Sequence, residues 1–207
     1  MPVSHAANSD TFTLSTPSDR EITITRLFDA SPALVFEAMT KPEHVRRWWG
    51  NLDDRYSVTV CEIDLRVGGA WRFVGRGPEG QFPAFHGVYR EIDAPGRLVY
   101  TEIFEPFPDV ESVVTQILTG EGSKTRLTVT SSYPSLEVRD MVLETGMEKG
   151  AALSYDRLDE VARIARAVRE LGEAALEVQH LGPGRCRECD QQCGDRLTPR
   201  CARTPGD

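Results

Sequence analysis

The sequence predicts an α+β domain in which a curved antiparallel sheet of six to seven strands wraps around a long C-terminal helix, with two short helices after the first strand. Between Tyr56 and Tyr133, apolar and polar residues alternate with period two, which is typical of half-buried strands. Short turns containing glycine or proline separate these segments and favour antiparallel neighbours. Apolar residues then recur at helical spacing, namely Leu153, Leu158, Val161, Ala165 and Val168.

Each element has its own local signal. Residues 21–28 alternate with period two and form the first expected strand. Ser31 is a suitable N-cap and Pro32 suits the first helical position, so a short helix is expected to begin there. Pro42 begins a second short helix, which ends at Gly50. The later strands are expected at 56–61, around 71–73, and at 82–93, 98–105, 112–119 and 125–133, before a final helix from about Met147 to Leu171.

The chain is expected to contain one folded domain, at 21–170. Residues 1–20, rich in Ser, Thr, Ala and Pro, are interpreted as a flexible leader, with pairing near its end left open. Residues 171–207 form a tail rich in Cys, Arg, Gly and Pro. The tail has too few apolar residues to build a core, so we expect it to be disordered unless something holds it.

Composition excludes several classes of function. The net charge of −8 argues against general nucleic-acid or anionic-membrane binding, since both need a basic face. No apolar stretch approaches the roughly 18–20 residues that span a bilayer, and the N-terminus lacks the pattern of a secretory signal. Four of the five cysteines follow residue 185, so no disulfide framework is expected in the body. A protein of the reducing cytoplasm, monomeric or homodimeric, is the resulting expectation.

Aromatic and a few polar residues interleave on the strands, as in sheets that cover an apolar pocket with polar groups. The expected ligand-binding residues are Trp49, Trp71, Phe73, Phe85, His86, Tyr100, Glu102 and Gln116. Inside an apolar cavity the pKa of Glu102 would rise, and His86 could share a proton with it. Of the adjacent Trp48 and Trp49, at most one is expected to face inward from a helix.

The alternative is that the aromatic residues are ordinary core and that the polar ones lie on the outer face of the sheet. Strand parity does not separate these readings, because one bulge reverses it. No catalytic residue and no cofactor is predicted, since the sequence contains no nucleophile elbow, phosphate loop or dinucleotide fingerprint. No metal site is predicted in the body of the chain.

The tail contains a separate cluster of four cysteines, Cys186, Cys189, Cys193 and Cys201. Four thiolates can hold zinc tetrahedrally, and the first pair has suitable spacing. The second pair is loosely spaced and no apolar residues flank the cluster. Zinc binding, thiol redox chemistry and an incidental tail all stay open, and composition favours the last.

Several short motifs follow one another in a fixed order. They are Ser31-Pro32 with Val35-Phe36, Lys41-Pro42 to Trp48-Trp49-Gly50, Asp64-Leu65-Arg66-Val67-Gly68-Gly69, His86-Gly87, Glu91-Ile92, Arg97-Leu98-Val99-Tyr100-Thr101-Glu102, and Gly150 with Leu153 and Asp156-Arg157-Leu158. In this order they resemble the START-like (SRPBCC) superfamily with its helix-grip fold. Within it the chain is similar to the branch named for the C-terminal domain of the heat-shock-protein-90 ATPase activator, and the resemblance covers roughly residues 21–170.

The resemblance implies binding of a small hydrophobic or amphipathic molecule in a cavity between the sheet and the C-terminal helix. Its branch name implies a second possibility, a co-chaperone-like module that stimulates a heat-shock-protein-90 type ATPase. A small cyclase- or lyase-type enzyme, similar to polyketide cyclases, is the third. The chain departs from the family at Ala151, where relatives tend to carry Trp, and the smaller side chain would enlarge the cavity unless another group fills the gap.

Overall fold

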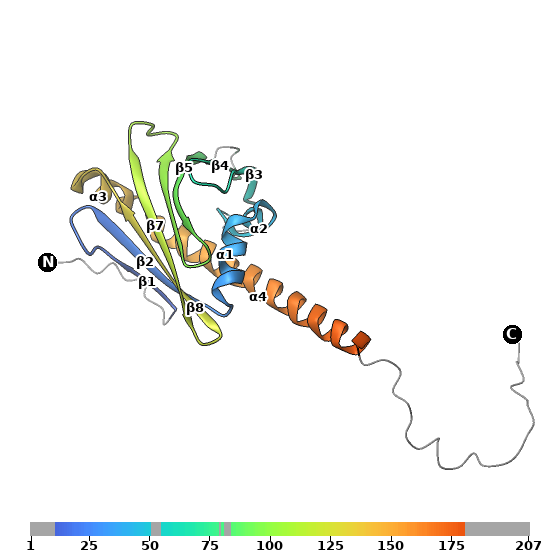
Figure 1. Ribbon diagram of the computed structural model, residues 1–207. Helices are drawn as coiled ribbons and strands as arrows, with labels where there is room; N and C mark the ends of the chain where they lie inside the picture. Colours follow the sequence, from blue (N-terminus) through green and yellow to red (C-terminus); the bar gives the residue numbers. More distant parts are fainter. Residues whose placement is uncertain (1–10, 51–54, 79, 81–83, 181–207) are drawn as a thin grey trace, which may run out of the picture. The chain divides into compact units, whose positions relative to one another are not determined.

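The computed structural model describes residues 11–50, 55–78, 80 and 84–180. The chain divides between Val168 and Arg169 into two compact units, and the first contains the sheet. Its described strands form one antiparallel sheet of eight strands in the order β1-β2-β8-β7-β6-β5-β4-β3 (Figure 1). The described part of the second unit is helical as far as His180.

The strands are β1 (Phe12–Ser15), β2 (Glu21–Phe28), β3 (Ser57–Ile63), β4 (Ala70–Arg76), β5 (Ala84–Asp93), β6 (Arg97–Phe104), β7 (Glu111–Glu121) and β8 (Lys124–Ser132). The helices are α1 (Pro32–Thr40), α2 (Pro42–Trp48), α3 (Leu136–Glu144) and α4 (Met147–His180). The predicted α+β class and the long C-terminal helix are confirmed. All neighbouring strands are antiparallel, as the short connections indicated.

The structure differs from the predicted secondary structure in three places. The sheet has an eighth strand among the described residues, β1, which lies inside the segment expected to be a flexible leader. It pairs with β2 and buries Phe12 and Leu14. Helix α3 was not predicted, although Ser135 caps it by accepting a hydrogen bond from the Val138 backbone N–H at 3.3 Å. Helix α4 continues to His180, beyond the predicted end at Leu171, because Gly172 costs a helix only about 1 kcal/mol.

Alternate residues of the strands face the first part of α4 and form the core. On β2 the buried positions are Ile22, Ile24, Arg26 and Phe28, and the intervening residues are more exposed. From α4, Leu158, Val161 and Ala162 are fully buried in the same cluster. We call this side of the sheet the concave face, since the strands curl around α4 there (Figure 1). Antiparallel twist together with bulges produces such curvature.

The pairing of β5 with β6 is interrupted between His86 and Tyr89, just before a bulge between Tyr89 and Glu91. The Trp71 indole N–H donates a hydrogen bond to the Thr101 backbone oxygen at 3.2 Å, and the Val88 N–H bonds instead to the Thr101 hydroxyl at 3.1 Å. Gly87 permits this arrangement, since a Cβ there would lie 1.7 Å from the Thr101 oxygen and 2.8 Å from Trp71 Nε1. The His86-Gly87 motif therefore has a structural role, because it allows the Trp71 indole to take the place of a backbone hydrogen bond between the two strands.

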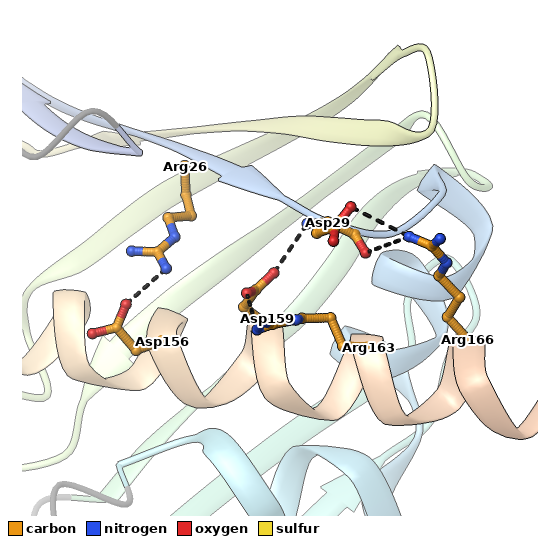
Figure 2. A network of polar contacts seen from close by, with 6 residues as sticks. All are labelled: Arg26, Asp29, Asp156, Asp159, Arg163 and Arg166. Carbon is orange, nitrogen blue, oxygen red and sulfur yellow. Dashed lines mark hydrogen bonds and ion pairs between the residues drawn. The ribbon is translucent and has the colours of Figure 1, made fainter.

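Polar contacts fasten α4 to β2 and to the turn before α1 (Figure 2). Arg26 reaches from the concave face to Asp156 at 2.7 Å. The Asp29 N–H donates to the Asp159 carboxylate at 3.0 Å, and Arg166 lies 3.3 Å from the Asp29 carboxylate. Because residues 130 or more apart in sequence are joined here, these contacts fix the position of α4 along the sheet.

Replacing Gly87 by Ala should destabilise the fold by about 2–4 kcal/mol, because the new methyl group would overlap the Thr101 carbonyl and displace the Trp71 indole. Urea unfolding measures the change. Gly120→Ala is the matched control on β7, since its Cβ would be 3.6 Å from the nearest atom, Pro32 Cγ, and should change stability by less than about 1 kcal/mol. Equal effects of the two substitutions would contradict the role given to Gly87.

Candidate functional site

Polar side chains gather on the concave face around β6 and β7. The strand register places Tyr100 opposite Val114, Glu102 opposite Ser112 and Gln116 opposite Leu98. Gln116 is therefore diagonal to Tyr100, and its amide N–H donates a hydrogen bond to the Tyr100 hydroxyl at 3.0 Å. The Gln116 carbonyl oxygen is buried and has no hydrogen-bond partner. The sheet thus brings three of the predicted site residues, Tyr100, Glu102 and Gln116, to one face.

Glu102 is half-buried and is the acidic group of this cluster. Burial away from water raises the pKa of its carboxyl from 4.5 to about 7. Within the described residues, no cation pairs with it. Burial also raises the pKa values of Tyr100, Tyr133 and Tyr155, and the negative charge of Glu102 adds to each of these shifts. The three phenols stay neutral near pH 7, so Glu102 is the member of this cluster whose charge changes there.

Aromatic rings form a continuous wall beside this polar group. Trp49 contacts Phe73 and Phe85 edge-on, with ring centroids 5.3 and 5.7 Å away. Trp71 lies 4.9 Å from Phe73 and 5.4 Å from Tyr100. The Trp71 N–H is already used by Thr101, so this residue offers a ligand only its ring. The predicted aromatic residues do lie together, and Trp71 also serves the structural role that the alternative reading assigned to it.

The expectation that only one of Trp48 and Trp49 faces inward is wrong. Trp48 is buried, donates its indole N–H to the Ala38 carbonyl at 2.9 Å and lies 6.4 Å from Tyr155. Trp49 also packs against the core. Both can do so because α2 ends at Trp48 and Trp49 has an extended backbone, with ψ of 125°. Helical geometry no longer sets the direction of the second ring.

His86 lies on the opposite, outer face of the sheet and so does not meet Glu102. It is the cross-strand neighbour of Arg72, and its Nδ1 lies 3.3 Å from the Glu105 carboxylate. Arg72 binds both oxygens of Glu105, at 2.7 and 3.1 Å, and thereby lowers the pKa of Glu105. An open groove of about 460 Å³ lies here, lined by Glu62, Ala70, Trp71, Arg72, His86, Gly87, Val88 and Glu105.

Metal binding has no support in the described part of the chain, where no group of three or more His, Cys, Asp or Glu side chains converges. Cys61 is buried without a disulfide, and burial raises the pKa of its thiol to about 11. A thiol of that pKa is a poor nucleophile and a poor metal ligand near neutral pH. Cys186, Cys189, Cys193 and Cys201 lie outside the described residues.

Three residues of the concave site were not predicted: Arg26, Tyr133 and Tyr155. Tyr155 lies three residues before Leu158 and seven before Ala162, so helical spacing could have placed it on the inward stripe of α4. Tyr133 continues the parity of Leu127 and Val129 just after β8. No sequence pattern predicted that Arg26 faces inward, because an arginine at a buried position interrupts the apolar pattern of the strand.

The eight-stranded sheet curled around a long C-terminal helix, with a mixed aromatic and polar concave face, defines a helix-grip protein. A family model described as Activator of Hsp90 ATPase homolog 1-like protein matches residues 29–163, and the chain belongs to this family. No significant match to a curated protein was found. The predicted branch of the START-like superfamily is thereby confirmed.

Solved structures agree with this assignment. A Rhodobacter sphaeroides protein is 25% identical with a TM-score of 0.67, the match covering 74% of this chain and 98% of that one. A Mycobacterium smegmatis protein is also 25% identical, with a TM-score of 0.63 and coverage of 78% and 96%. An Arthrobacter aurescens protein shares the fold at 24% identity and a TM-score of 0.65, over 73% and 91% of the two chains. Among the described residues, no helix is both long and apolar enough to cross a membrane.

The raised pKa of Glu102 predicts a pH-dependent cost to stability. Below about pH 4.5 the carboxyl is protonated in both the folded and the unfolded chain, so it costs nothing. Between pH 4.5 and about 7 the folded chain holds a proton that the unfolded chain releases, so the free energy of unfolding falls as pH rises, and above 7 the cost is constant. Glu102→Gln should therefore raise the free energy of unfolding by about 1–3 kcal/mol at pH 8.

Urea denaturation of parent and variant at pH 4 and pH 8 measures this difference. At pH 4 the two proteins should be equally stable, because the glutamate is then neutral as well. A gain of the same size at both pH values would show that the substitution acts through packing and not through charge.

Proposed function

We propose that the protein binds a small amphipathic molecule between the concave face of the sheet and α4. The proposal is carried by polar groups without partners on one aromatic face of the sheet. The Gln116 carbonyl has no hydrogen-bond donor, and Glu102, which lies on the same face beyond Tyr100, has no cationic partner in the described chain. Buried polar atoms normally find partners, so those left without one mark places where a ligand or water completes the structure.

Partial exposure of inward-facing residues supports the same proposal. Tyr100, Glu102, Tyr133 and Tyr155 point toward the core, yet each keeps some accessible surface. On α4, Ala151 and Ala152 pack against the core cluster, and their side chains take up less space than a larger residue would. Binding sites in proteins are commonly apolar concavities with a few polar groups, and this composition fits that description.

Ala151→Trp tests the proposal by filling the space. A neutral fluorescent dye, Nile red, should bind the parent protein with an emission shift to shorter wavelength, and Ala151→Trp should weaken binding at least tenfold, because the indole would occupy the dye's position. Leu153→Trp is the matched control: it adds an indole on an exposed position of the same helix and should leave the affinity within twofold of the parent. Undiminished dye binding by a folded Ala151→Trp protein would refute the internal site.

The family description favours a second function, interaction with a heat-shock-protein-90 type chaperone. Exposed apolar side chains at Leu65, Val67 and Phe107 offer contact surface on loops of the first unit. A stable protein interface usually buries about 800 Å² per partner, and scattered side chains of this kind fall short of a continuous patch. We therefore rank chaperone stimulation below ligand binding.

Adding the full-length protein to a heat-shock-protein-90 type ATPase should change its steady-state ATP hydrolysis by less than about twofold, because the available apolar contact surface is small. A coupled ATPase assay over a range of protein concentrations gives the measurement. Saturable stimulation of several-fold, reduced by Val67→Glu, would reverse the ranking of the two functions.

A further inference from the structure

The polar groups on the concave face are incompletely bonded, and their inventory constrains what can bind there. The Gln116 amide uses one N–H on the Tyr100 hydroxyl, which leaves its carbonyl oxygen as a buried acceptor without a donor. The Tyr100 hydroxyl accepts that bond and still has its own proton to donate, for which no acceptor lies within hydrogen-bond distance in the described chain. One free acceptor and one free donor therefore lie side by side.

A hydroxyl group satisfies both at once, because it can accept from Tyr100 and donate to Gln116. A hydroxyl still fits if the amide is turned by 180°, although an ether oxygen would then fit as well. Tyr100 would then donate to the Gln116 carbonyl, and the amide N–H groups would face the ligand oxygen. An ether oxygen can only accept, so it would leave the Gln116 carbonyl unpaired in the first arrangement, and an unpaired buried acceptor costs free energy.

The charges nearby argue against an anionic ligand. Arg26 is the only buried cation in the described chain; its Nη2 contacts Asp156 at 2.7 Å, so its charge is paired, while its Nε is buried without a hydrogen-bond partner. Glu102 lies two residues from Tyr100 on the same face of β6, and the other titratable groups near it are phenols: Tyr100, Tyr133 and Tyr155. A carboxylate entering here would meet a carboxyl group and no free positive charge, which disfavours it in a poorly solvated site.

From these contacts we infer that the ligand of the concave site is an uncharged amphipathic alcohol or phenol, whose hydroxyl bridges Tyr100 and Gln116, and that fatty and aromatic carboxylates are excluded by Glu102. This inference rests on the proposed function, since it names the ligand class of the same site. It also replaces the broader class of any hydrophobic or amphipathic molecule that the sequence allowed.

The test is competition for Nile red on the full-length protein at pH 8. The competitors are 1-decanol, decyl methyl ether and decanoate, each kept below the concentration at which it aggregates. One well-placed hydrogen bond is worth about fivefold in affinity, so decanol should displace the dye at concentrations about fivefold lower than the ether. Decanoate should need at least tenfold more than decanol.

Two substitutions separate the head-group effects from differences in chain partitioning. Gln116→Leu should reduce the advantage of decanol over the ether to less than about twofold, and Tyr100→Phe provides the same readout if the leucine variant does not fold. Glu102→Gln should improve decanoate binding at least threefold while leaving decanol within twofold, because it removes a charge but keeps the shape.

The two proposals fail in different ways. Absence of Nile red binding to the parent protein, or full binding by Ala151→Trp, would remove the internal site itself. Dye binding with decanoate competing as well as decanol, or a decanol preference that survives Gln116→Leu and Tyr100→Phe, would overturn the ligand class and leave the site in place.

Discussion

One constraint organises the structure: the apolar concave face of a single curved sheet has to be covered by helices. A sheet of this kind cannot leave that face in water, and the first part of α4 covers it together with residues of α1 and α2 that belong to the same core cluster. The inward positions of α4 combine bulk at Leu158 with small residues at Ala151, Ala152 and Ala162. Leu158 and Ala162 are fully buried, whereas Ala151 and Ala152 keep some exposed surface. The first turns of α4, around Ala151, are therefore where we place the candidate site.

The position of α4 along the sheet is held by charge as well as by packing. Arg26 extends from β2 to Asp156, while Asp29 contacts Asp159 about one turn further along α4 and Arg166 about three turns further along (Figure 2). A buried cation left without a partner would cost several kcal/mol, so this pair strongly disfavours sliding of the helix. One consequence bears on function. Because Asp156 balances the charge of Arg26, the described chain offers no unpaired positive charge here to Glu102 or a bound anion, although the Arg26 Nε lacks a hydrogen-bond partner.

Much of the fold could be predicted from the sequence because its strands are long and alternate cleanly, as in β2, β7 and β8. The four residues of β1 were too few for periodicity to distinguish them from a leader, and burial of Phe12 depends on contact with Tyr155 from the far end of the chain.

The candidate site could be predicted from the sequence only in part. Tyr100, Glu102 and Gln116 share a face because β6 and β7 pair without a bulge, whereas His86 takes the other face. The hydrogen bond from the Trp71 indole to the Thr101 backbone oxygen joins residues on two strands, and no local sequence pattern predicts it.

The two faces of the sheet differ in how far their polar groups are satisfied, and this difference decides which face carries the candidate function. On the outer face, Glu105 accepts two hydrogen bonds from Arg72 and approaches His86, so its charge is balanced within the protein. On the concave face, Glu102 lacks a cationic partner in the described chain and the Gln116 carbonyl lacks a donor, although both are more shielded from water. A polar group without a hydrogen-bond partner destabilises the fold most where it is shielded from water. Apolar residues at these positions would avoid that loss of stability. The presence of polar residues at these positions is the physical reason to place the ligand on the concave face. A hydroxyl group of the ligand can bond to both the Tyr100 hydroxyl and the Gln116 carbonyl without adding charge.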